Sequence, residues 1–223
     1  KEITVSNLFK DPPEDETSPV DPLLSVTDNS QAYFKKYNKM KTRSTIGEEK
    51  LKECEDRLAY LNETLYFASQ VTTKQDLEAL KEELKSLGID KRQKQHRKPS
   101  RKNQDPKIES RIIDGFRVYL GTSNTKNEYL TLRKAAKTDI WFHAKAIPGS
   151  HVVIETQGES VPPETLEKVA ALAAWNSKGR ESGKVDVDYT LIRYVKKIPN
   201  GPPGLVNYSH QKTIVAVPED VKE

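Results

Sequence analysis

The chain has 223 residues, of which 35% are hydrophobic and 31% are charged, and its formal net charge at pH 7 is +4. This apolar share lies below the roughly 45–50% of ordinary globular domains, which excludes one large core and favours an elongated or partly unfolded chain. No apolar run reaches the roughly 18 residues that a membrane-spanning helix needs. The single cysteine excludes an intramolecular disulfide framework, so we expect a soluble protein of a reducing compartment such as the cytoplasm.

Charge and composition change in blocks along the chain. Residues 31–45 carry five basic side chains and no acidic one, whereas residues 46–90 carry six basic and eleven acidic side chains. We therefore predict four segments: a remnant strand with a proline-rich lead-in at 1–27, a helical hairpin at 28–90, a basic flexible linker at 91–107 and an α+β domain at 108–223. Because the chain opens on Lys1 and its single methionine is Met40, we interpret it as part of a longer protein.

The first segment contains one strand-like stretch. Apolar residues alternate over 3–9, which predicts a strand, while prolines at positions 12, 13, 19 and 22 favour irregular structure after it. We expect the partner strands in the preceding part of the longer protein.

A long helix is predicted from Thr27 or Asp28, both good N-caps, to about Ser69. Apolar residues step by three and four along it, as in a coiled-coil seam: Leu51, Cys54, Leu58, Leu61, Leu65 and Ala68. About 40 helical residues at 1.5 Å each give an arm roughly 60 Å long, with Cys54 in its core. A second helix over 77–87 repeats the spacing and is expected to fold back. Thr73 with Asp76 resembles a capping box before this helix, and Gly88 is predicted as the residue that follows its end. The sequence thus predicts a long antiparallel helical hairpin, a coiled-coil arm.

Positive charge is concentrated in two places. The first lies early in the long helix and consists of Lys35, Lys36, Lys39, Lys41 and Arg43, which we take as candidate RNA contacts. The second is the segment 91–107, which carries eight basic residues and one acidic residue and predicts a flexible linker. This linker is either a solubilising hinge or a contact for nucleic acid or another polyanion, and the sequence leaves both open.

The last segment has the composition of a compact domain, and both tryptophans lie in it. Apolar runs on either side of Asp114-Gly115 predict a β-hairpin over 111–120. Further strands are predicted at 139–145, 151–155, 188–197, 204–208 and 213–217, and helices at 128–137 and 160–178. Together these elements predict an α+β fold with a mainly antiparallel sheet.

The strand predicted at 139–145 alternates between an apolar face and a face with an aromatic ring, an imidazole and a cation. Rings beside cations are what RNA-binding modules use to hold unstacked bases and the backbone. The candidate RNA-binding residues on and near this face are Trp141, His143, Lys145, His151, Arg193, Lys196 and Lys197. In the alternative interpretation, Trp141 belongs to the core and His143 makes a structural hydrogen bond.

Patterns that indicate an enzyme are weak. The sequence contains no nucleophile elbow with a Ser–His–Asp order and no GxxxxGK[ST] phosphate-binding loop. Asp186 and Asp188 could hold a metal ion, but no further acids follow at suitable spacing. We therefore expect a binding module rather than an enzyme, with no cofactor and no metal.

Several blocks of the sequence resemble one family. The stretch YLTLRKAAKTDIWFHAKAIPGSHVVI (129–154) resembles the signature of the NFACT-R domain, and so do VDYT (187–190), VKK (195–197) and GLVNYSHQKTI (204–214). Upstream, VDPLLSVTDNSQAYFKKYNKMK (20–41) is similar to the start of the coiled-coil middle region of the same proteins. Because these blocks occur in the expected order, the chain is identified as a member of the RqcH/NEMF-like (NFACT) family of ribosome quality-control factors.

The resemblance implies a binding function. Family members bind a large ribosomal subunit obstructed by peptidyl-tRNA, recruit tRNA and support alanine tailing of the stalled nascent chain, while the ribosome makes the peptide bond. The R domain is implied to bind RNA, and Trp141, His143, Lys145 and His151 match its motif. In Gram-positive bacteria, members are also called fibronectin/fibrinogen-binding proteins. The alternative is therefore an adhesin that binds host fibronectin or fibrinogen at the cell surface without an anchor.

Overall fold

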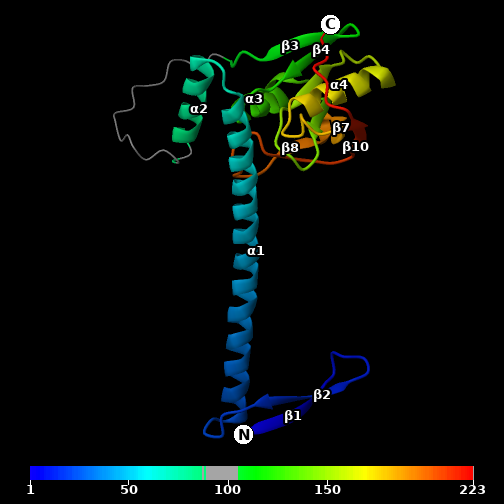
Figure 1. Cartoon of the computed structure of the whole chain (residues 1–223). Coiled ribbons are helices and arrows are strands. Elements are labelled where there is room, and N and C mark those ends of the chain that lie inside the picture. Colours follow the sequence, from blue (N-terminus) through cyan, green and yellow to red (C-terminus); the bar gives the residue numbers. More distant parts are fainter. Residues whose placement is uncertain (87, 89–104, 223) are drawn as a thin grey trace. The chain divides into compact units, whose positions relative to one another are not determined.

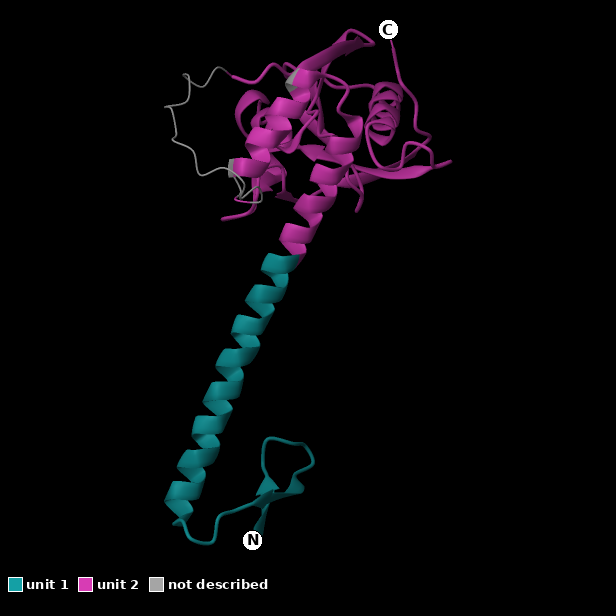
Figure 2. Cartoon of the chain, turned by 60° about the vertical axis from the view of Figure 1, so that its left-hand side comes forward, with its two compact units in different colours: residues 1–54 teal, residues 55–223 magenta. Residues whose placement is uncertain are grey.

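The computed structural model describes residues 1–86, 88 and 105–222 (Figure 1). They belong to two compact units, Lys1–Cys54 and Glu55–Glu223, which Figure 2 shows in different colours. The basic linker predicted at 91–107 lies mostly outside the described residues, so both of its interpretations stay predictions. Among the helices that are described, none is both long and apolar enough to cross a membrane.

The first unit contains a two-stranded antiparallel hairpin of β1 (Glu2–Asn7) and β2 (Glu14–Pro19). The expectation that β1 finds its partner outside this chain is therefore wrong. The sequence of β2, EDETSP, shows no apolar alternation that could have marked it as a strand. Polar cross-strand contacts accompany the backbone pairing instead, such as the 2.9 Å hydrogen bond between the hydroxyls of Thr4 and Thr17.

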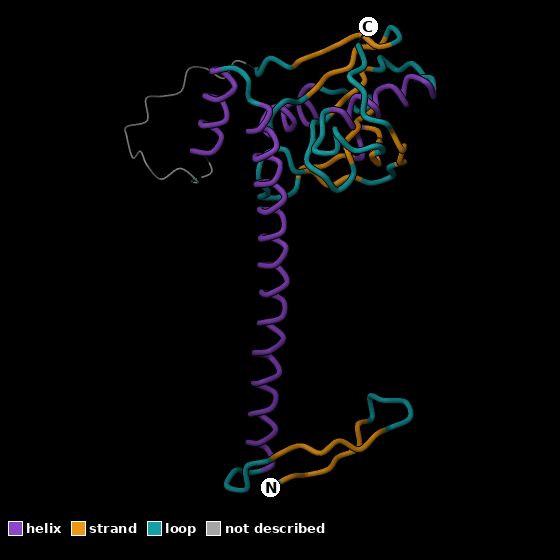
Figure 3. Tube along the Cα trace, in the orientation of Figure 1, coloured by secondary structure: helices purple, strands orange, loops and turns teal. Residues whose placement is uncertain are grey.

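The predicted long helix is present as α1 (Val26–Gln70), a single helix of 45 residues (Figure 3). It begins slightly earlier than predicted because Ser25 is the cap: its Oγ accepts a 3.1 Å hydrogen bond from the backbone N–H of Asp28. The leucines of the predicted seam, Leu51, Leu58, Leu61 and Leu65, are exposed, and so is Cys54. The described residues therefore do not show a hairpin closed along this seam, and the expectation of a core position for Cys54 is wrong.

The second unit begins with the last turns of α1 and continues into α2 (Lys74–Ser86). Thr73 caps α2 as predicted, because its Oγ1 accepts a hydrogen bond from the backbone N–H of Asp76 at 3.1 Å and donates one to the Asp76 carboxylate at 2.6 Å. Gly88 has a φ of +68° and its N–H donates to the carbonyl of Lys85. The predicted role of this glycine after the helix is thus confirmed.

The centre of the second unit is a six-stranded sheet in the order β10-β7-β5-β6-β4-β3, with antiparallel pairing at every step. Its strands are β3 (Glu109–Ile113), β4 (Phe116–Leu120), β5 (Ile140–Ala144), β6 (Val152–Glu155), β7 (Val185–Leu191) and β10 (Lys212–Ala216). The hairpin predicted around Asp114-Gly115 is confirmed, with φ values of 48° and 83° at these two turn residues. The predicted α+β fold with a mainly antiparallel sheet is likewise confirmed.

The two faces of the sheet pack into different clusters. On one face, Phe142 and Ala144 of β5 pack with α4 (Pro163–Trp175), whose alanines at 170, 173 and 174 are fully buried and permit close approach. On the other face, Trp141 packs with Leu130 and Val153. The period-two alternation predicted for β5 is therefore confirmed, and both of its faces are covered.

Two regions differ from the predicted elements. The helix expected at 128–137 starts earlier, as α3 (Asn124–Tyr129), because the Oγ of Ser123 caps it, and it continues as a π-helical turn, η1 (Leu130–Lys134). The strand expected at 188–197 is interrupted by the 3-10 turn η2 (Ile192–Tyr194). The following β8 (Val195–Lys197) leaves the main sheet and pairs with β9 (Val206–Tyr208) in a separate two-stranded sheet.

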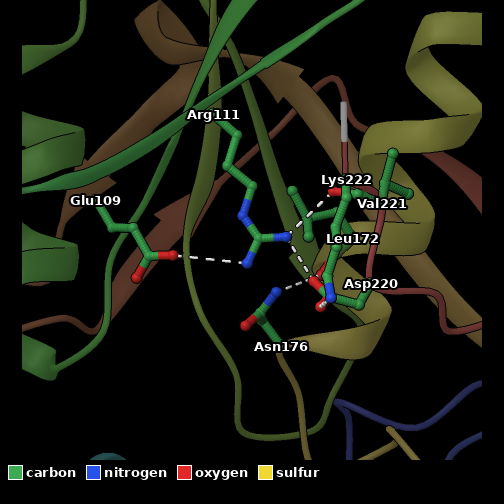
Figure 4. A network of polar contacts seen from close by, with 7 residues as sticks. All are labelled: Glu109, Arg111, Leu172, Asn176, Asp220, Val221 and Lys222. Atoms are coloured by element: carbon green, nitrogen blue, oxygen red, sulfur yellow. Dashed lines mark hydrogen bonds and ion pairs between the residues drawn. The ribbon is translucent and has the colours of Figure 1, made fainter.

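The segment after β10 is fastened to the opposite edge of the main sheet. Figure 4 shows the guanidinium of Arg111 on β3 directed at the carboxylate of Asp220 and at the carbonyl of Val221, to which it donates at 3.1 Å. The carboxylate of Glu109 lies 3.6 Å from the same guanidinium. Hydrogen bonding to Arg111 lowers the pKa of Asp220, so this pairing persists below neutral pH.

Candidate nucleic-acid interface

The five basic residues predicted as RNA contacts on α1 are all exposed and all lie in the first unit: Lys35, Lys36, Lys39, Lys41 and Arg43. Exposed rings accompany them, since Phe34 is 65% and Tyr37 is 56% exposed, and their ring centroids are 6.4 Å apart. The Nζ of Lys41 lies 6.0 Å from the centre of the Tyr37 ring. Cations beside exposed rings suit phosphates and unstacked bases, although these rings were not among the contacts predicted from the sequence.

The predicted face on β5 is organised differently from the prediction. Trp141 is fully buried and His151 is 2% exposed, so neither presents a ring to solvent, and the structure agrees with the alternative of a core tryptophan. His143 is partly buried, with its ring stacked on Trp141 at a centroid distance of 5.7 Å and an angle of 16°. The face is covered because α1 and β9 pack over it, which the periodicity of one strand cannot reveal.

The predicted cations of the second unit are all on the surface. Lys145, Arg193 and Lys196 are exposed. Lys197 is exposed too, but its Nζ lies 2.9 Å from the carboxylate of Glu128, which neutralises part of its charge. The role of these four residues in RNA binding stays a prediction.

Trp141, His143 and His151 line a pocket of about 420 Å³, which we call the α1–β5 pocket. Its other walls come from the last turns of α1, from the loop after β5 and from the segment leading into β9: Glu55, Leu58, Ala59, Asn62, Glu63, Ala146, Ile147, Pro148, Gly204, Leu205, Val206 and Tyr208. The Trp141 ring meets His151 edge to face at 5.1 Å and lies 4.8 Å from the Tyr208 ring. Aromatic residues therefore form much of the inner wall.

The polar groups of the α1–β5 pocket are only partly paired. The Oε1 of Glu63 lies 3.5 Å from the Nε2 of His143, without hydrogen-bond geometry. Glu63 Oε2, His143 Nε2 and Trp141 Nε1 are buried and have no hydrogen-bond partner among the described residues. A buried group of this kind costs about 1–3 kcal/mol when it stays unpaired. A ligand that supplies both hydrogen-bond donors and acceptors could pair these three atoms.

His151 is held in its neutral form. Burial, and then the neighbouring His143, keep the pKa of His151 well below its usual range. Its Nδ1 lies 2.8 Å from the hydroxyl of Thr131, and its backbone N–H donates to Asn127 Oδ1 at 2.9 Å. The ring thus has a fixed position at the back of the pocket.

A buried polar network fixes the α1 wall of the pocket. The hydroxyl of Tyr60 donates to Glu83 Oε1 at 2.8 Å, and the side-chain amide of Asn124 donates to the same oxygen at 3.0 Å and to Thr64 Oγ1 at 2.9 Å. Burial and the hydrogen bond to Glu83 raise the pKa of Tyr60, so the phenol stays protonated as the donor. The network joins α1, α2 and α3 and holds the helical turn that carries Glu63 in place.

Another surface group lies around η2, with three exposed members and one partly buried member, Tyr194, and of these only Arg193 was predicted from the sequence. The backbone N–H and the Nε of Arg193 donate to the carbonyl of Lys137 at 3.3 and 3.4 Å. The next residue, Tyr194, stacks on the exposed ring of His210, with centroids 4.3 Å apart and an angle of 25°. We call Lys137, Arg193, Tyr194 and His210 the η2 patch. Tyr194 and His210 meet only because β8 and β9 pair, so no local motif could have shown them.

One of the two aspartates considered for a metal ion has a structural role. The carboxylate of Asp188 is buried and accepts hydrogen bonds from the hydroxyls of Tyr208 at 2.9 Å and Thr213 at 2.6 Å. Asp186 is exposed. Within the described ranges, no group of three or more His, Cys, Asp or Glu side chains is arranged to hold a metal ion.

Comparison with known families gives two matches that together span most of the chain. Residues 1–103 match the profile of the NFACT N-terminal and middle domains. Residues 110–209 match the profile of the NFACT protein RNA binding domain. The second match contains the α1–β5 pocket residues of the sheet and all of the η2 patch except His210.

Curated relatives extend the likeness. The chain is 36% identical over 222 residues to the Rqc2 homolog RqcH of Bacillus subtilis (strain 168), covering 98% of this chain and 38% of the relative. It is 35% identical over 205 residues to the Rqc2 homolog RqcH of Streptococcus pneumoniae (strain D39), covering 91% and 36%. The chain thus spans less than two-fifths of the length of these relatives.

Among solved structures, the chain resembles the C-terminal part of the fibronectin/fibrinogen-binding protein from Streptococcus suis. The TM-score is 0.75 and the sequence identity is 35%, with 87% of this chain and 77% of that chain covered. Similarity in sequence and in fold therefore point to the same group of proteins.

Proposed function

Because the chain belongs to the NFACT family, we propose that it binds RNA of the large ribosomal subunit as part of a ribosome quality-control factor. The likeness to RqcH proteins and to the NFACT RNA binding domain supports this proposal. A ribosomal partner implies work in the cytoplasm.

The observation that carries the proposal is the η2 patch. Arg193 and Lys137 are two exposed basic residues joined through the Lys137 carbonyl, and Tyr194, which is partly buried, and His210, which is exposed, supply a stack on which a base can rest. RNA modules combine these features, since cations attract the backbone and rings accept unstacked bases. Lys145 and Lys196 are further exposed cations of this unit, and the basic block of α1 offers a separate contact in the other unit.

We further propose that the whole protein acts on obstructed subunits that carry peptidyl-tRNA, binds tRNA and supports alanine tailing of the stalled chain. In this proposal the chain is a binding factor rather than an enzyme, and the ribosome makes the peptide bond. We also propose a coiled-coil arm, because the exposed heptad leucines of α1 suit a seam that is completed by a partner helix of the longer protein.

Co-sedimentation with purified large subunits tests the proposal. We expect the double variant Lys137→Glu/Arg193→Glu to bind at least tenfold more weakly than the parent chain at physiological salt. The matched control Arg117→Glu/Lys184→Glu makes the same charge change at exposed positions outside the η2 patch and should bind like the parent. Equal binding by all three proteins would overturn the assignment of the patch.

The Streptococcus suis relative, described as a fibronectin/fibrinogen-binding protein, favours a second candidate function. As an adhesin, the chain would bind host fibronectin or fibrinogen at a surface. Salt separates the two functions, because RNA binding through phosphates falls steeply as salt rises. Saturable fibronectin binding that persists at about 0.5 M salt, without binding to ribosomal subunits, would favour the adhesin.

A further inference from the structure

The α1–β5 pocket takes no part in the RNA contact proposed for the η2 patch, yet it combines an aromatic lining with unpaired polar atoms. We propose that this pocket binds one unstacked purine base. The inference rests on the proposed function, because an RNA strand would supply the base, but it concerns other residues and can fail separately.

The size and lining of the pocket suit a flat ring. Its volume of about 420 Å³ falls within the roughly 300–1,000 Å³ typical of small-molecule sites. Leu58, Ile147 and Leu205 provide apolar walls, and Trp141 and Tyr208 add aromatic ones. A ring that enters would leave water for an apolar and aromatic surface, as unstacked bases do in RNA-binding modules.

The unpaired polar atoms select the edge of a base over other ligands. Trp141 Nε1 can only donate a hydrogen bond, and the carboxylate of Glu63 can only accept one. A purine meets both needs, because guanine carries N1–H beside O6 and adenine carries its amino group beside N1. A lysine or arginine side chain of a protein partner has donors only and would leave Trp141 Nε1 unpaired.

Charge excludes a phosphate as the inserted group. Glu55 and Glu63 both line the pocket, and they would repel an anion placed between them. The base would therefore enter while its phosphates stay outside. We expect a purine rather than a pyrimidine, because the bicyclic ring covers more of the predominantly apolar lining.

The two tryptophans of the chain make a direct test possible. Trp141 lines the pocket and its indole N–H is buried and unpaired, whereas the Trp175 ring lies under the guanidinium of Arg180, at 3.7 Å, and serves as an internal reference. In NMR titrations of the chain with guanosine, adenosine and cytidine, we expect purines to shift the Trp141 indole signal in a saturable way. Cytidine should bind at least threefold more weakly, and the Trp175 signal should stay in place. An unmoved Trp141 signal, or equal binding of cytidine, would overturn the proposal.

A pair of matched variants tests the location. Ala59 is an exposed residue of α1 that lines the pocket, and Ala68 is an exposed residue of the same helix that does not. Because both positions are exposed, we expect phenylalanine at either one to leave the fold intact. We expect Ala59→Phe to lower guanosine affinity at least tenfold and Ala68→Phe to leave it unchanged. Parent-like guanosine affinity of Ala59→Phe would contradict the location.

A third arm separates this inference from the proposed function. The variant Arg193→Glu should weaken binding of single-stranded oligoadenylate and oligouridylate alike, and leave the guanosine response of Trp141 intact. If RNA binding falls in this variant while the Trp141 signal of the parent does not respond to purines, the purine-binding proposal is overturned and the proposed function is supported. If the Trp141 signal responds to purines and Arg193→Glu binds RNA like the parent, the assignment of RNA binding to the η2 patch is overturned and the purine-binding proposal is supported.

Discussion

The hydroxyl of Tyr60 on α1 donates a 2.8 Å hydrogen bond to the carboxylate of Glu83 on α2, although the two residues are only 2% and 7% exposed. The junction between these helices is therefore a buried polar contact rather than a seam of leucines. Polar junctions of this kind depend on every member being paired, since a buried group without a partner is costly. The network thus makes the position of α2 sensitive to single substitutions.

Replacing Glu83 should destabilise the second unit. Glu83→Ala leaves Tyr60, Asn124 and Thr125 without a shared acceptor, and we expect a loss of about 2–3 kcal/mol in the free energy of unfolding, measured in urea. The neighbouring Glu82 has a side chain that is 78% exposed, so Glu82→Ala should change stability by less than about 0.5 kcal/mol. Equal effects of the two variants would contradict the role of the network.

Stability should depend on pH through His151. Its pKa in the folded chain lies below that of the unfolded chain, near 6.5, so below this pH the unfolded chain binds a proton that the folded chain does not. The contribution of His151 to the free energy of unfolding is then fully present above about pH 6.5. It is lost as the pH falls towards the lowered pKa, with a slope of at most about 1.4 kcal/mol per pH unit. Urea unfolding at several pH values should show a shallower slope for His151→Asn than for the parent chain, and equal slopes would contradict this role of His151.

Gly121 should not tolerate a side chain. A Cβ atom at this position would lie 2.0 Å from Asn127 Oδ1, the atom that accepts the backbone N–H of His151. We expect Gly121→Ala to cost about 2–3 kcal/mol, because the buried amide must move and its hydrogen bond is lost. At Gly183, a Cβ atom would meet no heavy atom within 4 Å and the backbone has no positive φ. Gly183→Ala should therefore be neutral or stabilise by about 0.5 kcal/mol. Thermal unfolding of both variants measures the difference, and equal stabilities would contradict the role of Gly121.

The aromatic stack of the η2 patch should contribute to RNA affinity without affecting its salt dependence. Stacking of a base is worth about 1–3 kcal/mol, so Tyr194→Ala should weaken binding of single-stranded RNA by about 5- to 150-fold, while Tyr194→Phe should retain it. Arg193→Ala should instead reduce the magnitude of the slope of log affinity against log salt by about 1, because one phosphate contact is lost. Fluorescence anisotropy at several salt concentrations distinguishes the two effects, and identical salt slopes and affinities for all variants would contradict the patch.

Local signals predicted those parts of the fold that depend on local geometry. Thr73 with Asp76, Gly88 and Asp114-Gly115 were found because caps and tight turns are set by a few adjacent residues. The alternation along β5 was equally readable, since successive side chains of a strand point to opposite faces.

The features that the sequence did not reveal depend on contacts between distant segments. Nothing around Trp141 indicates that α1 and β9 cover it, so an exposed stacking ring and a core ring look alike in sequence. The strand β2 escaped notice because its pairing rests on backbone and polar contacts. Tyr194 and His210 lie 16 residues apart and meet through strand pairing, which has no local signature.

The link from Arg111 to Asp220 has a consequence for the order in which the domain can be completed. The two residues are separated by 109 positions, and they join the first strand of the main sheet to the segment that follows its last strand. During synthesis, the edge strand β3 leaves the ribosome long before the carboxylate that neutralises its arginine. At about 5–20 residues per second, this delay lasts roughly 5–20 seconds, during which β3 lacks its contact with the segment after β10.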